Sequence, residues 1–179
     1  MSALGLDLGT TSFKLVELEK IRTGFVLKHI GIAANPLGVV QVDSRDQRLL
    51  LAEAVKKLFS QSKTKQSRVR INLAENQSFT RIISLPPMSD AELGSAISWE
   101  AEEHIPVSLS EVQIDWSVIT RPPKGAAGEK MTILLVAAKK QSINQLVSLI
   151  AQTGLELVGI ETSLTAVVRS LVKPADPPT

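Results

Sequence analysis

The sequence contains no cysteine, and this absence excludes several kinds of chemistry at once. Disulfides, thiolate nucleophiles, cysteine zinc sites and iron–sulfur clusters all need that side chain. Tyrosine is also absent and aromatic residues make up only 3% of the chain, which argues against base-stacking platforms and aromatic cages. The charge is nearly balanced, with 20 Lys and Arg against 18 Asp and Glu, so the overall charge indicates no nucleic-acid partner.

Long hydrophobic runs are absent as well. No segment reaches the ~18 apolar residues that a membrane-spanning helix needs, and the longest apolar run, within residues 131–138, has the length of a strand. The N-terminus carries no basic region and reaches Asp7 at once, which is unlike a signal peptide. We therefore expect a cytoplasmic protein of one domain or two closely coupled ones, without direct membrane insertion.

The hydrophobic pattern predicts strands and helices in alternation. The first three β-rich segments are separated by two short turns, which is typical of an antiparallel meander. From Asp46 the apolar period becomes helical, and Ser89 with Glu92 forms a capping box before a helix that ends ahead of Pro106. The later predicted segments are strands at 67–75, 79–85, 112–119, 131–138 and 155–160 and helices at 141–153 and 161–171.

This order of elements predicts two α/β units, the second inserted into the first. The predicted inserted unit covers residues 79–153, between a first segment at 1–78 and a return segment at 154–172. Residues 122–128 are expected to form a flexible loop because they are rich in proline and glycine. The tail at 173–179 is rich in proline, and we interpret it as a truncation point.

Residues 5–12, GLDLGTTS, give the sharpest chemical signal. A strand ends in Asp7, and Gly9 with three hydroxyl side chains then fills a tight turn into the next strand. Consecutive amides in such a turn form an anion nest, and Thr or Ser hydroxyls add donors for phosphate oxygens. Asp7 would hold Mg²⁺ through water molecules. The alternative is a hairpin turn that happens to be rich in glycine and threonine.

Two further charged residues are candidates near this turn. Lys14 follows the turn by two residues and would contact phosphate as a point charge, or it is a solvated strand lysine. Glu161 is expected to begin the last helix, where a carboxylate would order a water or metal, or would simply stabilise the helix dipole. Glu100 and His104 have the i, i+4 spacing of metal ligands but lack a third ligand nearby, so we expect no metal site there.

The segment GLDLGTTSFKLVEL resembles the first phosphate loop of the actin-like ATPase superfamily. Residues 79–119 and 134–171 narrow the resemblance to the PilM family of type IV pilus assembly, with the string LPPM…WEAEEHIP as its most specific part. The resemblance implies an α/β, actin-like (ribonuclease H-like) ATPase fold that is partial and carries an inserted subdomain of the FtsA type, called 1C. It matches the first phosphate loop to Asp7, Gly9, Thr10, Thr11 and Ser12, with Lys14 just beyond.

The resemblance also implies a function and partners. PilM proteins bind ATP and hold the N-terminal cytoplasmic peptide of the membrane protein PilN between subdomains 1A and 1C, which links an inner-membrane complex to the pilus motor and platform. The family therefore implies ATP and Mg²⁺ as cofactors, at most a weak ATPase activity, and a location peripheral to the inner membrane. Glu161 matches the first residue of the superfamily's "connect" helix, near the attacking water, and is the candidate catalytic residue.

The sequence departs from the superfamily in lacking a second phosphate loop and an adenosine segment, which normally follow the connect helix. We therefore expect the N-terminal half of the fold, with weak or no ATP binding of its own. Apolar residues of the last helix, normally sandwiched between the halves, would then be exposed and drive homo-oligomerisation, which light scattering checks. These residues are Leu164, Val167, Val168 and Leu171.

Two other functions stay open at this point. One is an FtsA-like division protein, which a C-terminal amphipathic helix would distinguish. The other is a phosphotransferase of the sugar-kinase type, which needs a general-base aspartate. Asp115 is the candidate for that base, although its alternation with apolar neighbours favours a place on a polar sheet face. For peptide binding, Ile82, Ile83 and Leu85 are candidates, with ordinary core packing as the alternative.

Overall fold

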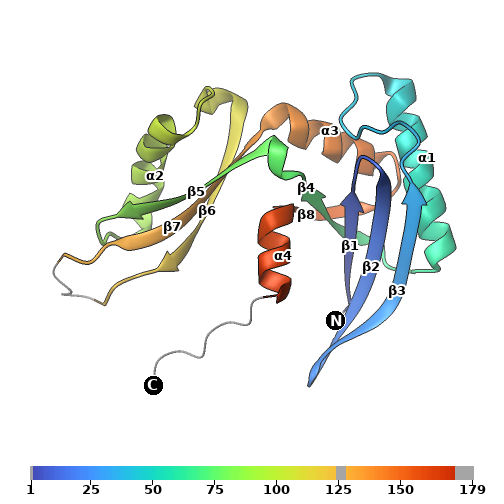
Figure 1. Cartoon of the computed structure of the whole chain (residues 1–179), viewed down its shortest axis with the longest axis horizontal. Coiled ribbons are helices and arrows are strands. Elements are labelled where there is room, and N and C mark those ends of the chain that lie inside the picture. Colours follow the sequence, from blue (N-terminus) through green and yellow to red (C-terminus); the bar gives the residue numbers. More distant parts are fainter. Residues whose placement is uncertain (1, 124–127, 172–179) are drawn as a thin grey trace. The chain divides into compact units, whose positions relative to one another are not determined.

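The computed structural model describes residues 2–123 and 128–171, which form two compact units (Figure 1). Unit 1 comprises residues up to Glu75 and from Asn144 onward, and unit 2 spans Asn76–Ile143. Residues 124–127 of the predicted loop and the whole predicted tail at 173–179 lie outside the described residues.

Unit 1 is built on a five-stranded sheet in the order β3-β2-β1-β4-β8. The first three strands are antiparallel, as the meander pattern predicts, whereas β4 runs parallel to both β1 and β8. Buried and accessible side chains alternate along β1, β2 and β4. The strands are β1 (Ser2–Leu8), β2 (Ser12–Ile21), β3 (Gly24–Ala34), β4 (Arg68–Leu73) and β8 (Glu156–Thr162).

Helix α1 (Arg45–Ser62) covers one face of this sheet. Its buried stripe, Leu51, Val55 and Leu58, has the i, i+4, i+7 spacing of an amphipathic helix. Gly31 on β3 makes room for the helix, because a Cβ there would lie 2.8 Å from a methyl carbon of Leu58. Gly31 is paired with Leu15, so the buried side chains of β2 face α1 while their sequence neighbours point to the opposite face.

The opposite face of the sheet carries helix α4 (Ser163–Leu171), which contacts β4 and β8. Next to the helix this face presents small residues such as Ala3 and Gly5, together with the polar side chains of Asp7, Lys14 and Asn72. It therefore differs from the α1 face in leaving space that a ligand can occupy.

Unit 2 contains a three-stranded antiparallel sheet in the order β5-β7-β6 and helix α2 (Asp90–His104). Its strands are β5 (Ser78–Leu85), β6 (Val112–Thr120) and β7 (Met131–Lys139). One core joins the helix to the sheet, with Leu93, Ile97 and Ala101 as the inward residues of α2, as the sequence predicts. Short 3₁₀ turns precede β5 and β6, at Glu75–Gln77 and Leu109–Glu111.

Helix α3 (Lys140–Ala151) spans the division between the units. The sequence places the whole of this helix in the inserted unit, which it predicts at 79–153, whereas unit 2 of the structure ends at Ile143. Gln145, in the part of α3 that belongs to unit 1, donates a hydrogen bond to Asp43 of the same unit at 2.7 Å. Gly154 has the left-handed φ expected of a cap, 79°, but α3 ends at Ala151, three residues before it.

The predicted capping box at the start of α2 is confirmed. The Ser89 hydroxyl accepts from the Glu92 amide, and the Glu92 carboxylate accepts from the Ser89 amide at 2.9 Å and from its hydroxyl at 2.7 Å. These bonds from the Ser89 hydroxyl and amide favour the charged form, so they lower the pKa of Glu92.

This lowered pKa predicts a pH-dependent contribution to stability. Because the folded-state pKa lies below the unfolded one, the stabilisation is complete above the unfolded pKa and is lost as the pH falls through the folded pKa. We expect wild type to melt higher than Glu92→Gln at pH 7, and the difference to shrink in acid. Thermal unfolding of both proteins at pH 7 and pH 3 measures this, and an equal difference at both values would contradict it.

Candidate functional site

A cavity of about 520 Å³ lies on the α4 face of the sheet in unit 1. Strands β1, β2, β4 and β8 supply its floor, and α4 supplies its wall. The structure brings three sequence-predicted site residues together here, since Asp7, Lys14 and Glu161 all line the cavity. Arg70, Asn72 and Arg169 complete its polar lining together with Ser163.

The charged side chains of this cavity form two ion pairs. Lys14 lies directly opposite Asp7 across the β1–β2 ladder, and its ammonium contacts the Asp7 carboxylate at 2.8 Å. Glu161, near the end of β8, is paired with Arg169 of α4. Both pairs remain accessible to solvent, so each contributes at most about 1 kcal/mol to stability. Their accessibility leaves the two cations able to exchange partners with an anionic ligand.

Arg70 is the fifth charged group of the cavity. Within the described residues its guanidinium has no acidic partner, and it lies over Gly159 of the neighbouring strand. A Cβ at Gly159 would lie only 2.8 Å from the Arg70 Nη1 atom, so glycine makes room for this arginine. Three cations against two carboxylates leave one positive charge in the cavity, which favours an anionic ligand.

The loop Gly9–Ser12 connects β1 to β2 beside this cavity. It closes through a bond from the Gly9 amide to the Ser12 carbonyl at 3.2 Å. A Cβ at Gly9 would lie 2.7 Å from that carbonyl oxygen and 3.9 Å from the Lys14 Nζ atom. The position therefore requires glycine, and the Lys14 ammonium lies at the loop.

Asn35 holds this loop from the end of β3. Its side chain donates to the carbonyls of Gly9 at 3.0 Å and Val39 at 2.9 Å, and accepts from the Leu37 amide at 2.9 Å. Its own amide donates to the Thr11 carbonyl at 3.0 Å. The hydrogen bonds of Asn35 thus hold the loop in place without a bound ligand.

Asn72 connects the end of β1 to the beginning of α4. Its side-chain oxygen accepts from the Leu8 amide at 2.9 Å, and its side-chain nitrogen donates to the Ser163 hydroxyl at 2.9 Å. Ser163 in turn donates to the Leu73 carbonyl at 3.2 Å. This partly buried network joins three segments that are far apart in the sequence, and it lies immediately before the Gly9–Ser12 loop.

The residues present fit a phosphate-bearing ligand. In the described part of the chain, the amides of Thr10 and Thr11 have no protein acceptor, and both residues are exposed. These amides, the hydroxyls of the loop and the Lys14 ammonium are donors suited to phosphate oxygens. Residues 2–123 and 128–171 contain no cluster of three or more acidic or histidine side chains arranged to ligate a metal directly. A cation bound here would need phosphate oxygens of the bound ligand or water molecules to complete its coordination, in addition to Asp7.

The expected position of Glu161 is wrong in one respect. It does not begin the last helix, because β8 continues through Thr162, which pairs with Leu73 of β4. Helix α4 begins at Ser163, where the Thr162 hydroxyl accepts from the Thr165 amide at 3.3 Å and so acts as its cap. The Glu161 side chain nevertheless lines the cavity.

Other sequence candidates lie elsewhere. Glu100 and His104 pair at 3.4 Å on α2, without a third ligand among the described residues. Asp115 is exposed on β6 and accepts a hydrogen bond from the Trp116 amide. On β5, Ile83 and Leu85 belong to the core and only Ile82 is exposed. The four apolar residues expected at the surface of α4 are all exposed.

The sequence prediction missed Asn35, Arg70, Asn72, Ser163 and Arg169. Only Asn35 carries a local signal, because an Asn-Pro dipeptide marks a turn. Asn72 and Ser163 are recognisable only once the register of β4 against β1 and β8 is known.

The fold and the site together define a class of protein. An antiparallel meander extended by two parallel strands, with a second α/β unit inserted between them and a Gly-Thr loop after the first strand, is part of the actin-like ATPase fold. Residues 5–173 match the family described as type IV pilus assembly protein PilM. The chain therefore belongs to the PilM family.

Solved structures agree with this assignment. A PilM–PilN type IV pilus biogenesis complex matches 94% of this chain with a TM-score of 0.82 and 27% sequence identity. The match covers 49% of the other chain, so this chain spans about half the length of that relative. The cytoplasmic domain of EpsL, from the inner-membrane part of the Vibrio cholerae type II secretion system, matches 97% of this chain and 60% of its own. Its TM-score is 0.61 at 12% identity, which shows the fold alone.

A separate property concerns the membrane. None of the helices in residues 2–123 and 128–171 combines the length and the hydrophobicity of a bilayer-spanning helix.

Proposed function

We propose that this chain acts in type IV pilus assembly as an actin-like scaffold that binds a peptide from a PilN-like inner-membrane protein. The observation that carries the proposal is the likeness to a PilM–PilN complex, which extends over 94% of the chain at 27% identity. In this role the protein works in the cytoplasm, peripheral to the inner membrane through its partner, and communicates with the pilus motor and platform.

The partner peptide in this proposal is a short N-terminal segment that binds in extended form. Extended peptides gain affinity from main-chain hydrogen bonds and specificity from pockets for alternate side chains. A scaffold of this kind needs no catalytic turnover to function, so the proposed activity is binding, with at most weak ATP hydrolysis in a protein that carries the whole fold.

The cavity of unit 1 has a distinct role in this proposal, as one wall of a nucleotide site. The amides and hydroxyls of Gly9, Thr10, Thr11 and Ser12, with Lys14, would contact the phosphates of ATP, and Asp7 would hold Mg²⁺ through water. Glu161 would order a water near the terminal phosphate, and Arg70 would add a positive charge to the same wall. The observation in support is a glycine cradle beside a cavity that carries excess positive charge.

A photo-crosslinking experiment tests the peptide-binding function. The N-terminal peptide of the same organism's PilN-like protein, carrying a benzophenone group, is irradiated with this chain and the products are digested for mass spectrometry. We expect one saturable adduct that excess unlabelled peptide prevents. An equal yield from a peptide of scrambled sequence would contradict the proposal, because specific binding depends on the order of side chains.

A further inference from the structure

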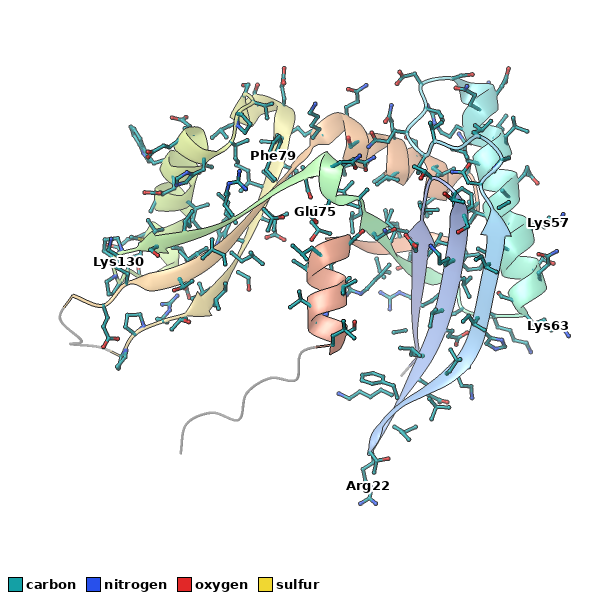
Figure 2. All side chains as sticks on the ribbon, viewed as in Figure 1. Arg22, Lys57, Lys63, Glu75, Phe79 and Lys130 are labelled. Atoms are coloured by element: carbon teal, nitrogen blue, oxygen red, sulfur yellow. The ribbon has the colours of Figure 1, made fainter. Side chains whose placement is uncertain are left out.

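The β2–β3 hairpin contains a β-bulge that separates its base from its tip. Glu17 lies opposite His29, but the next residue, Leu18, lies opposite Leu27, so Lys28 is the extra residue of β3. A bulge of this kind bends a strand and strengthens its local twist. The two strands then continue past the C-terminal end of α1, near Lys63, to a tip at Arg22 (Figure 2).

The tip of this hairpin, residues 18–28, exposes large apolar side chains. Phe25 is 66% and Leu27 is 53% exposed, and Ile21 and Val26 are exposed as well. Successive residues of a strand point to opposite faces, so Phe25 and Leu27 share one face while Val26 points to the other. Apolar groups therefore project from both faces of the ribbon. A folded protein partner would cover only one of these faces, whereas the interface of a lipid bilayer would surround both.

The charge of the tip is also distinctive. Residues 18–28 carry Lys20, Arg22 and Lys28 against a single acid, Glu19, which pairs with Lys28 at 3.0 Å. Within the described residues Lys20 and Arg22 have no acidic partner. Two free cations beside exposed Phe and Leu side chains complement an anionic membrane surface, which attracts basic groups and accepts apolar ones.

We propose that the tip of the β2–β3 hairpin binds the surface of an anionic lipid bilayer, with Phe25 and Leu27 entering the interface and Lys20 and Arg22 contacting lipid headgroups. This contact goes beyond the proposed function, in which the membrane is reached only through the partner protein. It is peripheral and involves no bilayer-spanning segment.

Because the sequence contains no cysteine, a cysteine introduced at one position can be labelled specifically. Thr23→Cys at the tip and Lys57→Cys on α1 each provide a single site for an environment-sensitive fluorophore. The labelled proteins are titrated with vesicles of phosphatidylcholine alone and of phosphatidylcholine with phosphatidylglycerol at 3:1. We expect the tip label to brighten with the anionic vesicles and the α1 label to stay unchanged. Higher salt should weaken the response because it screens the headgroup charges.

Variants identify the groups responsible by sedimentation with the same vesicles. We expect Phe25→Ser/Leu27→Ser and Lys20→Glu/Arg22→Glu each to lose at least about ten-fold in binding. Ile30→Ser is the matched control, since Ile30 is also 66% exposed on β3 but lies on the other side of the bulge. All substituted side chains are exposed, and circular dichroism verifies that each variant is folded.

Several results would overturn the proposal. These are no binding to anionic vesicles, equal binding to neutral ones, and loss of binding in Ile30→Ser to the same degree as in the tip variants. Self-association that depends on Phe25 and Leu27, seen by light scattering without vesicle binding, would instead assign the tip to a second copy of the chain. None of these outcomes depends on the pilus peptide, so this proposal and the proposed function fail independently.

Discussion

Replacing Gly9 with alanine is expected to destroy the response of the β1–β2 loop to phosphate. The new Cβ would lie 2.7 Å from the Ser12 carbonyl oxygen, which is closer than non-bonded atoms approach, so the bond from the Gly9 amide to that carbonyl must open. Forcing an extra carbon into a closed loop typically costs about 1–3 kcal/mol in stability. The amides of Thr10 and Thr11 then lose the arrangement in which both can donate to one ligand.

Nuclear magnetic resonance of the ¹⁵N-labelled chain measures this effect. We expect millimolar MgATP or pyrophosphate to shift the amide signals of residues 9–12 in wild type, weakly because one wall of a site is present, and not in Gly9→Ala. Gly94→Ala is the glycine control, because Gly94 lies on α2 in unit 2 and a Cβ there would contact only the Trp116 ring, at 4.0 Å. Equal shifts in Gly9→Ala and wild type would contradict a phosphate role for the loop.

Replacing Asn72 with alanine is expected to separate the loop from α4. The Leu8 amide and the Ser163 hydroxyl each lose a partner, and leaving partly buried polar groups unsatisfied costs about 1–3 kcal/mol. Because the lost bonds fix both the end of β1 and the start of α4, local opening should increase in the two segments together.

Hydrogen exchange measured by mass spectrometry separates this coupling from a general loss of stability. In Asn72→Ala we expect faster exchange in peptides covering residues 5–14 and 161–171, with little change in β6 and β7 of unit 2. Ser163→Ala is the sharper variant, since it keeps the bond from the Leu8 amide to Asn72 and removes only the link to α4. If exchange in residues 5–14 is unaffected by both variants, Asn72 does not couple the two segments.

The features that the sequence predicted well are those whose signals are local. The meander follows from apolar runs separated by short turns, and the start of α2 follows from Ser89 and Glu92, three residues apart. The Gly-Thr loop was found for the same reason, because a strand, a glycine and three hydroxyls are consecutive in the chain.

The features that it missed depend on distant segments. Asn72 acquires its role from the pairing of β4 with β1 and β8, and unit 2 separates β4 from β8 in the sequence. The predicted helix at 161–171 also began two residues too early, because pairing of Thr162 with Leu73 keeps Glu161 in a strand. Tertiary pairing, rather than local preference, decides both cases.

Fluorescence anisotropy of a labelled N-terminal peptide from the organism's PilN-like protein, titrated with this chain, decides whether the chain docks that protein. The scaffold account predicts saturable binding that a scrambled peptide does not reproduce. It also predicts unchanged affinity in Gly9→Ala, because the phosphate loop serves the nucleotide and not the peptide. Absence of binding, or equal binding of the scrambled peptide, would contradict the claim that this chain docks its membrane partner.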